Sequence, residues 1–325
     1  MELARDPGRL AALLHLDGDR EGARAGYLAA LARNPRDATA HNNLGYLLAQ
    51  EGRWGEAIAE YERSIQLNPA AGTARVNLGI ARSSTGDLAG GEALLREATE
   101  LDPTNVLAWD NLARLLLTMG DTESAERTWR RGLESVGPQP PLLTGLATVL
   151  AATGRRSEAI GFLRRAVEID PRSVEAWTQL GSLLFLRQDL GSAAEALRRA
   201  LNLVPTQHEA RHQLAMVLLA GGDQVAAAAE LERILELEPR HVGASLDLAV
   251  LALSRGTAAD ALGRLDTVLQ LDGVNQRAQF YRGVALHQLG RLAEAHGQLA
   301  ELEGNDSKYG RHAREYRTRV PSDIV

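Results

Sequence analysis

The sequence predicts an all-α solenoid, a stack of similar helix–turn–helix units, and three observations lead to this fold class. Prolines recur every 34 residues, leucines and small residues recur in the same register, and apolar residues within each unit follow helical spacing. The composition agrees, because 45% of the 325 residues are apolar and only 4% are aromatic. A core built from Leu, Ala, Val and Ile suits closely packed helices.

The prolines set the register. They lie 34 residues apart in two runs, which are Pro35, Pro69 and Pro103, then Pro171, Pro205 and Pro239. The same step reaches Gly137 between the runs and Gly273 after them. If the proline is position 32, nine units begin at residues 4, 38, 72, 106, 140, 174, 208, 242 and 276. Proline there ends the second helix of each unit, because it cannot continue a helix.

Four further columns define the two helices of each unit. Position 7 is leucine except in the last unit, where it is Arg282, and position 8 is always Ala or Gly. Position 20 is alanine except at Gly91, so we expect the two helices to cross closely at positions 8 and 20. Position 15 is glycine except at Gln188, and we expect it to end the first helix in the left-handed conformation.

Residues 1–325 are therefore expected to form a single solenoid. Residues 1–37 are expected to form an imperfect first unit, with Pro7 at position 4. Residues 137–141 are expected to form a stiff link, with a hinge as the alternative. Within the last segment, 304–325, residues 307–319 are expected to form a polar capping helix followed by a tail. Its basic residues, spaced by about three, indicate a solvated face or a contact with an acidic partner.

These columns resemble the tetratricopeptide repeat family, whose pattern has an aromatic residue, Leu-Gly, Ala, an aromatic residue and Pro at these offsets. The resemblance covers residues 4–303 and gives the tryptophans packing roles, with Trp109 and Trp177 at position 4, Trp54 at position 17 and Trp129 at position 24. It implies a right-handed superhelical solenoid. It also implies a concave groove lined by positions 2, 5, 6, 9, 12 and 13 of each first helix.

Position 6 carries the candidate site. Its residues are Asn43, Asn77, Asn111, Gly145, Gln179, Gln213, Asp247 and Tyr281, and Tyr46 is a further candidate groove residue. A carboxamide donates and accepts hydrogen bonds together, so a row of carboxamides can pair with a peptide backbone. This column resembles the asparagine ladder in the repeat region of O-linked N-acetylglucosamine transferase, with Gly145 interrupting it. The alternative is that these residues are only a polar lining.

A second kind of groove in the family, the two-carboxylate clamp of chaperone-binding repeats, needs Lys or Arg at positions 2, 5 and 6. Those positions hold Thr39, Asn42, Thr73, Val76, Leu107 and Asp110 in three adjacent units. We therefore expect no binding of acidic chaperone tails.

No catalytic residue, metal site or cofactor is predicted. Residues 208–212 match the zinc-protease motif H-E-x-x-H, but they occupy ordinary positions of a first helix, and the array has no spare segment for a third ligand. The glycines recur as helix stops and never form a phosphate-binding loop. The sequence has no cysteine, which excludes disulfides, thiolate metal sites and cysteine nucleophiles.

The sequence leaves three functions open. The first is a non-catalytic scaffold that binds an extended segment of a partner protein in its groove. The second is a structural protein that self-assembles, and the third is the repeat region of a larger enzyme such as a glycosyltransferase. The net charge of −6 disfavours nucleic acid as a partner. No membrane span or secretory signal is apparent, so a cytoplasmic location is expected.

Overall fold

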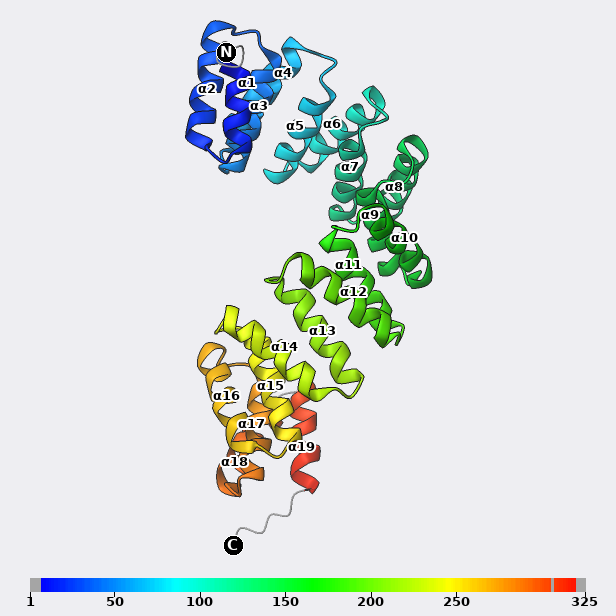
Figure 1. Ribbon diagram of the computed structural model, residues 1–325. Coiled ribbons are helices and arrows are strands. Elements are labelled where there is room, and N and C mark those ends of the chain that lie inside the picture. The colour runs from blue at the N-terminus through cyan, green and yellow to red at the C-terminus, as the bar shows by residue number, and fades with distance from the viewer. Residues whose placement is uncertain (1–6, 305–306, 320–325) are drawn as a thin grey trace. The chain divides into compact units, whose positions relative to one another are not determined.

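The computed structural model describes residues 7–304 and 307–319, and this part of the chain contains helices, turns and short links but no β-strand (Figure 1). The all-α repeat fold is confirmed. The first helices of the units are α1 (Pro7–Leu16), α3 (Ala38–Gln50), α5 (Gly72–Ser84), α7 (Val106–Thr118), α9 (Pro140–Ala152), α11 (Val174–Leu186), α13 (His208–Ala220), α15 (Val242–Ser254) and α17 (Gln276–Gln288).

The second helices alternate with them along the chain. They are α2 (Arg20–Arg33), α4 (Trp54–Leu67), α6 (Leu88–Leu101), α8 (Thr122–Val136), α10 (Arg156–Ile169), α12 (Leu190–Leu203), α14 (Gln224–Leu237), α16 (Ala258–Leu271) and α18 (Leu292–Glu303). From α3 onward, the first helices occupy positions 1–13 of the predicted register and most second helices occupy positions 17–30. The 34-residue period therefore places the helix boundaries correctly.

The helices form two compact units, residues 1–176 and residues 177–325, which we call unit 1 and unit 2. The 34-residue helix pairs are called repeats from here on. The division falls within α11. In unit 1, each first helix from α1 to α9 packs against the second helix that follows it, and each one from α1 to α7 also packs against the next first helix along the chain. In unit 2, the same packing joins α13 to α14, α15 to α16 and α17 to α18.

The close crossing at positions 8 and 20 is present as expected. A Cβ atom added to Gly45 would lie 2.8 Å from the ring of Tyr61 and 3.2 Å from the carbonyl oxygen of Ala57. The leucines at position 7 in α3 to α15 are at most 4% exposed, and Leu146 is fully buried. Leu10 is 43% exposed, because α1 is the first described helix and has packing neighbours on one side only.

Position 15 has the predicted left-handed conformation in all nine repeats. Eight of these residues are glycines with positive φ, such as Gly52 at +74° and Gly222 at +82°. The exception in sequence is not an exception in structure, because Gln188 has a φ of +65°. This conformation strains a residue that carries a Cβ atom, so the fold imposes it on the glutamine.

Side chains at position 4 make hydrogen bonds to the links between repeats. His41, Trp109, Arg211 and Gln279 each donate a hydrogen bond to the main-chain carbonyl six residues earlier, over N···O distances of 2.6–3.2 Å. Arg75 makes the same contact with the carbonyl of Pro69. In the fifth repeat this position is Leu143, whose side chain has no hydrogen-bond donor. There the link begins with Gly137 at a φ of +76° and ends with Pro140 as the first residue of α9.

The chain also has a helix at the expected capping segment. This helix, α19 (Lys308–Arg319), packs against α17 and α18. Its buried Ala313 and half-buried Tyr309 and Tyr316 cluster with Phe280 and Leu302. The phenolic oxygen of Tyr316 lies 3.2 Å from Nδ1 of His287. The tail that the sequence predicts beyond it, residues 320–325, lies outside the described residues.

Candidate functional site

The candidate residues lie on the first helices, and we call the surface made by positions 2, 5, 6, 9, 12 and 13 of these helices the first-helix face. In unit 1 the asparagines at position 6 are half-buried on α3, α5 and α7. They are Asn43, Asn77 and Asn111.

Two of these asparagines are joined through a third carboxamide. Asn77 donates from Nδ2 to Oδ1 of Asn42 over 2.9 Å, and Asn42 donates from Nδ2 to Oδ1 of Asn43 over 3.2 Å. The three side chains therefore form one chain of hydrogen bonds across α3 and α5. Within the described residues, no hydrogen bond occupies the amide of Asn43 or the carbonyl oxygen of Asn77. Such a chain is polarised in one direction, which strengthens the donor at one end and the acceptor at the other.

The third asparagine stands apart from this chain. Asn111 donates from Nδ2 to the carbonyl oxygen of Leu107 on its own helix, over 2.8 Å. Its neighbour at position 9, Arg114, pairs with Asp110 over 2.8 Å and approaches Glu175 to 3.8 Å. The ladder in unit 1 is thus two linked rungs and one separate rung.

Gly145 interrupts the column for a packing reason. A Cβ atom at this position would lie 2.4 Å from Cε2 of Trp129 on α8. The indole Nε1 of Trp129 donates to Oδ1 of Asp110 over 2.9 Å, which fixes the ring against α9. The tryptophan takes the space that a carboxamide side chain at position 6 would need.

Open cavities flank the linked rungs. One of about 400 Å³ lies between α1 and α3 and is lined by Ala12, His15, Leu16, Tyr27, Asn43, Tyr46 and Gln50. Tyr46 is 48% exposed there, and its ring lies 5.6 Å from that of His15. A second, of about 380 Å³, lies between α3, α4 and the start of α5, where Asn42, Thr39 and Thr73 contribute to its lining. These cavities lie at the positions where the family resemblance places the groove.

In unit 2 the polar residues at position 6 are held by contacts within the unit. Gln213 accepts a hydrogen bond from Oγ of Ser182 over 2.5 Å and donates to Glu209 over 3.2 Å. Gln179, also at position 6, is half-buried on α11. Tyr281 is half-buried on α17, with its ring 5.2 Å from that of Phe280.

Asp247 is the most enclosed of these residues, at 7% exposed. Its two oxygens lie 2.7 Å from Nε2 of His212 and 2.7 Å from a guanidinium nitrogen of Arg277, so it joins α13, α15 and α17. Burial opposes ionisation of this carboxyl, but the hydrogen bond from His212 and the charge of Arg277 outweigh it and hold the pKa of Asp247 below its ordinary value. Its oxygens are therefore already engaged, and its part in peptide binding stays a prediction.

The contact with Asp247 also accounts for one histidine of the H-E-x-x-H sequence. His212 faces Asp247, while Glu209 accepts from Gln213. Among residues 7–304 and 307–319, no group of three or more His, Cys, Asp or Glu side chains is placed to hold a metal ion. His212 and Glu209 of the motif therefore have structural contacts of their own.

Comparison with known families places the chain. Residues 5–231 match the profile of a tetratricopeptide repeat family described as the C-terminal domain of cilia and flagella-associated protein 70. Residues 212–266 and 258–309 match the profile described as tetratricopeptide repeat. The chain belongs to the tetratricopeptide repeat family. The family resemblance stated from the sequence is confirmed, and no curated protein is detectably similar to the chain in sequence.

Solved structures share this tetratricopeptide fold. The chain superposes on a structure described as the APC/C hetero-tetramer Cut9–Hcn1 with a TM-score of 0.60 at 15% identity, covering 82% of this chain and 52% of that one. The tetratricopeptide chain thus spans about half the length of that protein. It superposes on pilF of Pseudomonas aeruginosa with a TM-score of 0.57 at 20% identity, covering 65% of this chain and 96% of that one. At these identities the likeness shows the fold.

The tetratricopeptide fold supports a role in protein interaction in general. No described helix has the length and hydropathy needed to cross a lipid bilayer. Two features of the site were missed from the sequence. Asn42 links the rungs, and its signal was a carboxamide one residue before Asn43. Arg277 pairs with Asp247. The sequence signal for this pair is opposite charge at position 6 of one repeat and position 2 of the next, 30 residues apart.

Proposed function

We propose that this tetratricopeptide chain is a non-catalytic scaffold, and that the first-helix face of unit 1 binds an extended segment of a partner protein through its backbone. The observation that carries the proposal is the chain of carboxamides formed by Asn77, Asn42 and Asn43. It offers a donor at Asn43 and an acceptor at Asn77, which are the two complements of a peptide unit. Binding of this kind tolerates varied partner sequences, since every residue except proline has both backbone groups.

The internal hydrogen bonds make the site ordered before the partner arrives. Asn42 restrains both neighbouring side chains, so less side-chain freedom is lost when a peptide binds than for isolated asparagines. The bond pattern also gives the site a direction. A partner carbonyl pairs with the amide of Asn43, and a partner N–H pairs with Oδ1 of Asn77.

The flanking cavities supply the side-chain preference. Beside Asn43, the exposed ring of Tyr46 and the 84% exposed Leu16 favour an apolar or aromatic partner side chain. Beside Asn42, Thr39 and Thr73 favour a small polar one. Asn111 extends this contact on α7. Gln179, Gln213 and Tyr281 stay candidate peptide-binding residues of unit 2, taken by itself.

A protein partner fits the charge of the chain better than nucleic acid does, because the net charge of −6 repels phosphate. We keep the cytoplasmic location expected from the sequence as part of this proposal. Fractionation of cells that express the chain tests that location.

Site-specific cross-linking tests the proposal, because the sequence has no cysteine and any introduced one is unique. A benzophenone maleimide placed at Thr73→Cys, on the exposed start of α5, should cross-link a partner from cell lysate. The matched control is Asn202→Cys, an exposed position on the second helix α12. Mass spectrometry should then find one partner segment attached at residue 73. Equal capture from both positions, or none from residue 73, would contradict the proposal.

A further inference from the structure

A separate cavity lies on the second helices of unit 1, away from the first-helix face. It has a volume of about 280 Å³ and lies between α8, the link at Pro138, α9 and α10. Its floor is formed by Leu143 and Leu146, which are fully buried, and its walls by the half-buried Leu133 and Phe162. We call it the α8–α10 cavity.

The junction beside the cavity lacks a contact that five other junctions between repeats have. At those five, a donor at position 4 reaches back to the main-chain carbonyl of the link, as Trp109 and Arg211 do. Leu143 stands in that column here and cannot close the link. Gly137 ends α8 in a conformation with positive φ, and Pro138 follows at the edge of the cavity. An apolar floor that includes Leu143 therefore faces the opening of this cavity.

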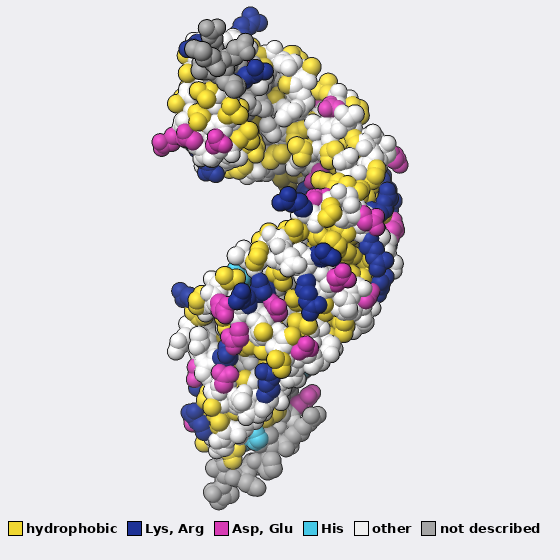
Figure 2. All heavy atoms as spheres, viewed as in Figure 1, with side chains coloured by type: hydrophobic (Ala, Val, Ile, Leu, Met, Phe, Trp, Pro, Cys, Tyr) yellow, Lys and Arg dark blue, Asp and Glu magenta, His cyan; other side chains and the backbone are white. Residues whose placement is uncertain are grey.

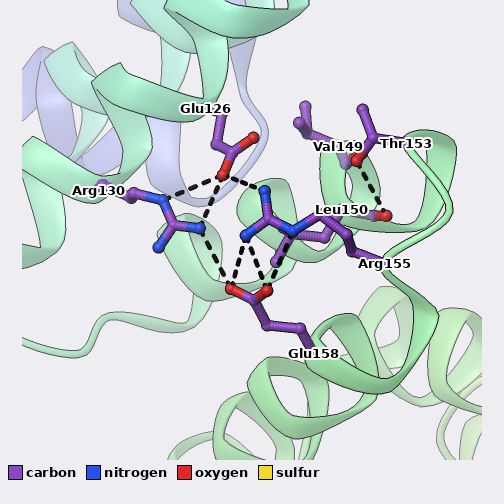
Figure 3. A network of polar contacts seen from close by, with 7 residues as sticks. All are labelled: Glu126, Arg130, Val149, Leu150, Thr153, Arg155 and Glu158. Atoms are coloured by element: carbon purple, nitrogen blue, oxygen red, sulfur yellow. Dashed lines mark hydrogen bonds and ion pairs between the residues drawn. The ribbon is translucent and has the colours of Figure 1, made fainter.

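A network of ion pairs fixes one side of the opening (Figure 3). Arg130 lies 2.7 Å from Oε1 of Glu126 and 3.1 Å from Oε1 of Glu158. Arg155 lies 2.7 Å from the same oxygen of Glu126 and 2.7 Å from Oε2 of Glu158. The two arginines hold the pKa of Glu158 below its ordinary value through their hydrogen bonds. The ion pairs with Glu126 and Glu158 therefore hold Arg130 in place and neutralise its charge.

The opposite rim carries charge that is not matched in this way. Arg165 lines the cavity from α10, and no ion pair joins it to another described residue. Glu134 lines the cavity as well. With the matched Arg130 left out, the flanking segments, residues 130–136 and 162–169, contain three arginines and two glutamates, in a chain whose net charge is −6. Figure 2 shows Lys and Arg side chains, with Asp and Glu side chains between them, along the edge formed by α8 and α10. This local excess of positive charge is complementary to an acidic segment.

We propose that the α8–α10 cavity binds a short acidic segment of a partner protein, which inserts one leucine or phenylalanine side chain between Leu133 and Phe162. A carboxylate beside that side chain pairs with Arg165. The space suffices, because an apolar cavity of about 150 Å³ admits a benzene ring. Shape selects the inserted side chain, and charge selects the residues around it.

A defined peptide tests this without knowledge of the natural partner. The probe is acetyl-DELFED-amide, titrated into the full chain while the methyl NMR signals of Leu133, Leu143 and Leu146 are followed. We expect these signals to shift with a dissociation constant of about 1 mM or tighter. Acetyl-DEAAED-amide, which lacks the apolar side chains, and acetyl-KKLFKK-amide, which reverses the charge, should leave them unchanged.

Two charge reversals on α10 form a matched pair. Arg165→Glu should weaken binding of the acidic probe about tenfold, while Arg164→Glu, on the same exposed side of the helix but outside the cavity lining, should change it less than about twofold. The double variant Asn43→Ala/Asn77→Ala should bind the probe as the parent does, which separates this site from the first-helix face. No shift of the three leucines at about 5 mM probe, or equal effects of the two reversals, would overturn the proposal.

Discussion

The packing of Trp129 over Gly145 makes a sharp prediction, because the same substitution at a nearby glycine should have the opposite sign. An alanine methyl at Gly145 would lie 2.4 Å from Cε2, 2.5 Å from Nε1 and 2.6 Å from Cζ2 of the indole. At Gly161, on α10, an added methyl meets nothing within 4 Å. Both residues are inside helices, so alanine gains about 0.5–1 kcal/mol of intrinsic helix stability at each.

Only the packing differs between the two sites. Gly161→Ala should therefore stabilise unit 1 by about 0.5–1 kcal/mol. Gly145→Ala must push the indole away, at a cost of about 1–3 kcal/mol for overpacking, and it strains the hydrogen bond from Trp129 to Asp110. Because the helix gain is the same at both sites, the packing cost of about 1–3 kcal/mol is the expected difference between the two variants, and the net loss at Gly145→Ala should be up to about 2.5 kcal/mol.

Thermal and urea denaturation, followed by circular dichroism and tryptophan fluorescence, measure this difference. Repeat arrays often unfold in parts, so the two variants should be compared on identical readouts. The indole N–H signal of Trp129 should move in Gly145→Ala and stay in place in Gly161→Ala. If both substitutions stabilise the protein equally, the indole does not occupy this place.

Three further substitutions test the repeat register, the turns and the buried ion pair. Ala159→Leu, at a fully buried crossing, should cost about 1–3 kcal/mol, while Arg164→Leu should stay within about 0.5 kcal/mol, and equal melting shifts would refute the register. Gln188→Gly should raise the free energy of unfolding by up to about 1 kcal/mol, and with it the melting temperature, because it relieves the strain of the left-handed conformation. A lower melting temperature would argue against that strain. Asp247→Asn should cost about 3 kcal/mol near neutral pH. Because the pKa of Asp247 is lowered in the folded state, its contribution is present above the unfolded value of about 3.9 and is lost as the pH falls through the folded value, so acid titration of stability should be flatter in Asp247→Asn. An unchanged acid titration would count against the pair.

The sequence predicts the fold well because the period encodes it. The proline column gives the helix boundaries, and the small residues at positions 8 and 20 give the crossing, as Gly45 and Ala57 show. Gln188 shows what a residue pattern cannot settle alone. The sequence marks it as a departure, yet its backbone has the glycine conformation, because the neighbouring helices fix the turn whatever side chain it carries.

The candidate site is predicted in position but not in bonding. Asn43 and Asn77 lie where the column places them, whereas the link through Asn42 depends on side-chain geometry between repeats. Asp247 belongs to the same column, but its burial depends on Arg277 and His212 in the neighbouring repeats. A column lists one residue type per repeat, so it does not reveal pairs formed between different columns of adjacent repeats.

The central claim is that Asn43 and Asn77 hold a partner backbone, and isothermal titration with the segment cross-linked at residue 73 tests it most directly. Each truncation to alanine removes hydrogen bonds worth about 0.5–1.5 kcal/mol net. The double variant Asn43→Ala/Asn77→Ala should therefore bind about 5- to 150-fold more weakly, whereas Asn202→Ala should bind as the parent does. Adding Asn111→Ala to the double variant should weaken binding by a smaller factor than either of the first two substitutions, since the Asn111 amide already donates to the carbonyl oxygen of Leu107. Parent-like affinity in the double variant, with unchanged melting, would contradict the account and leave the asparagines as a polar lining.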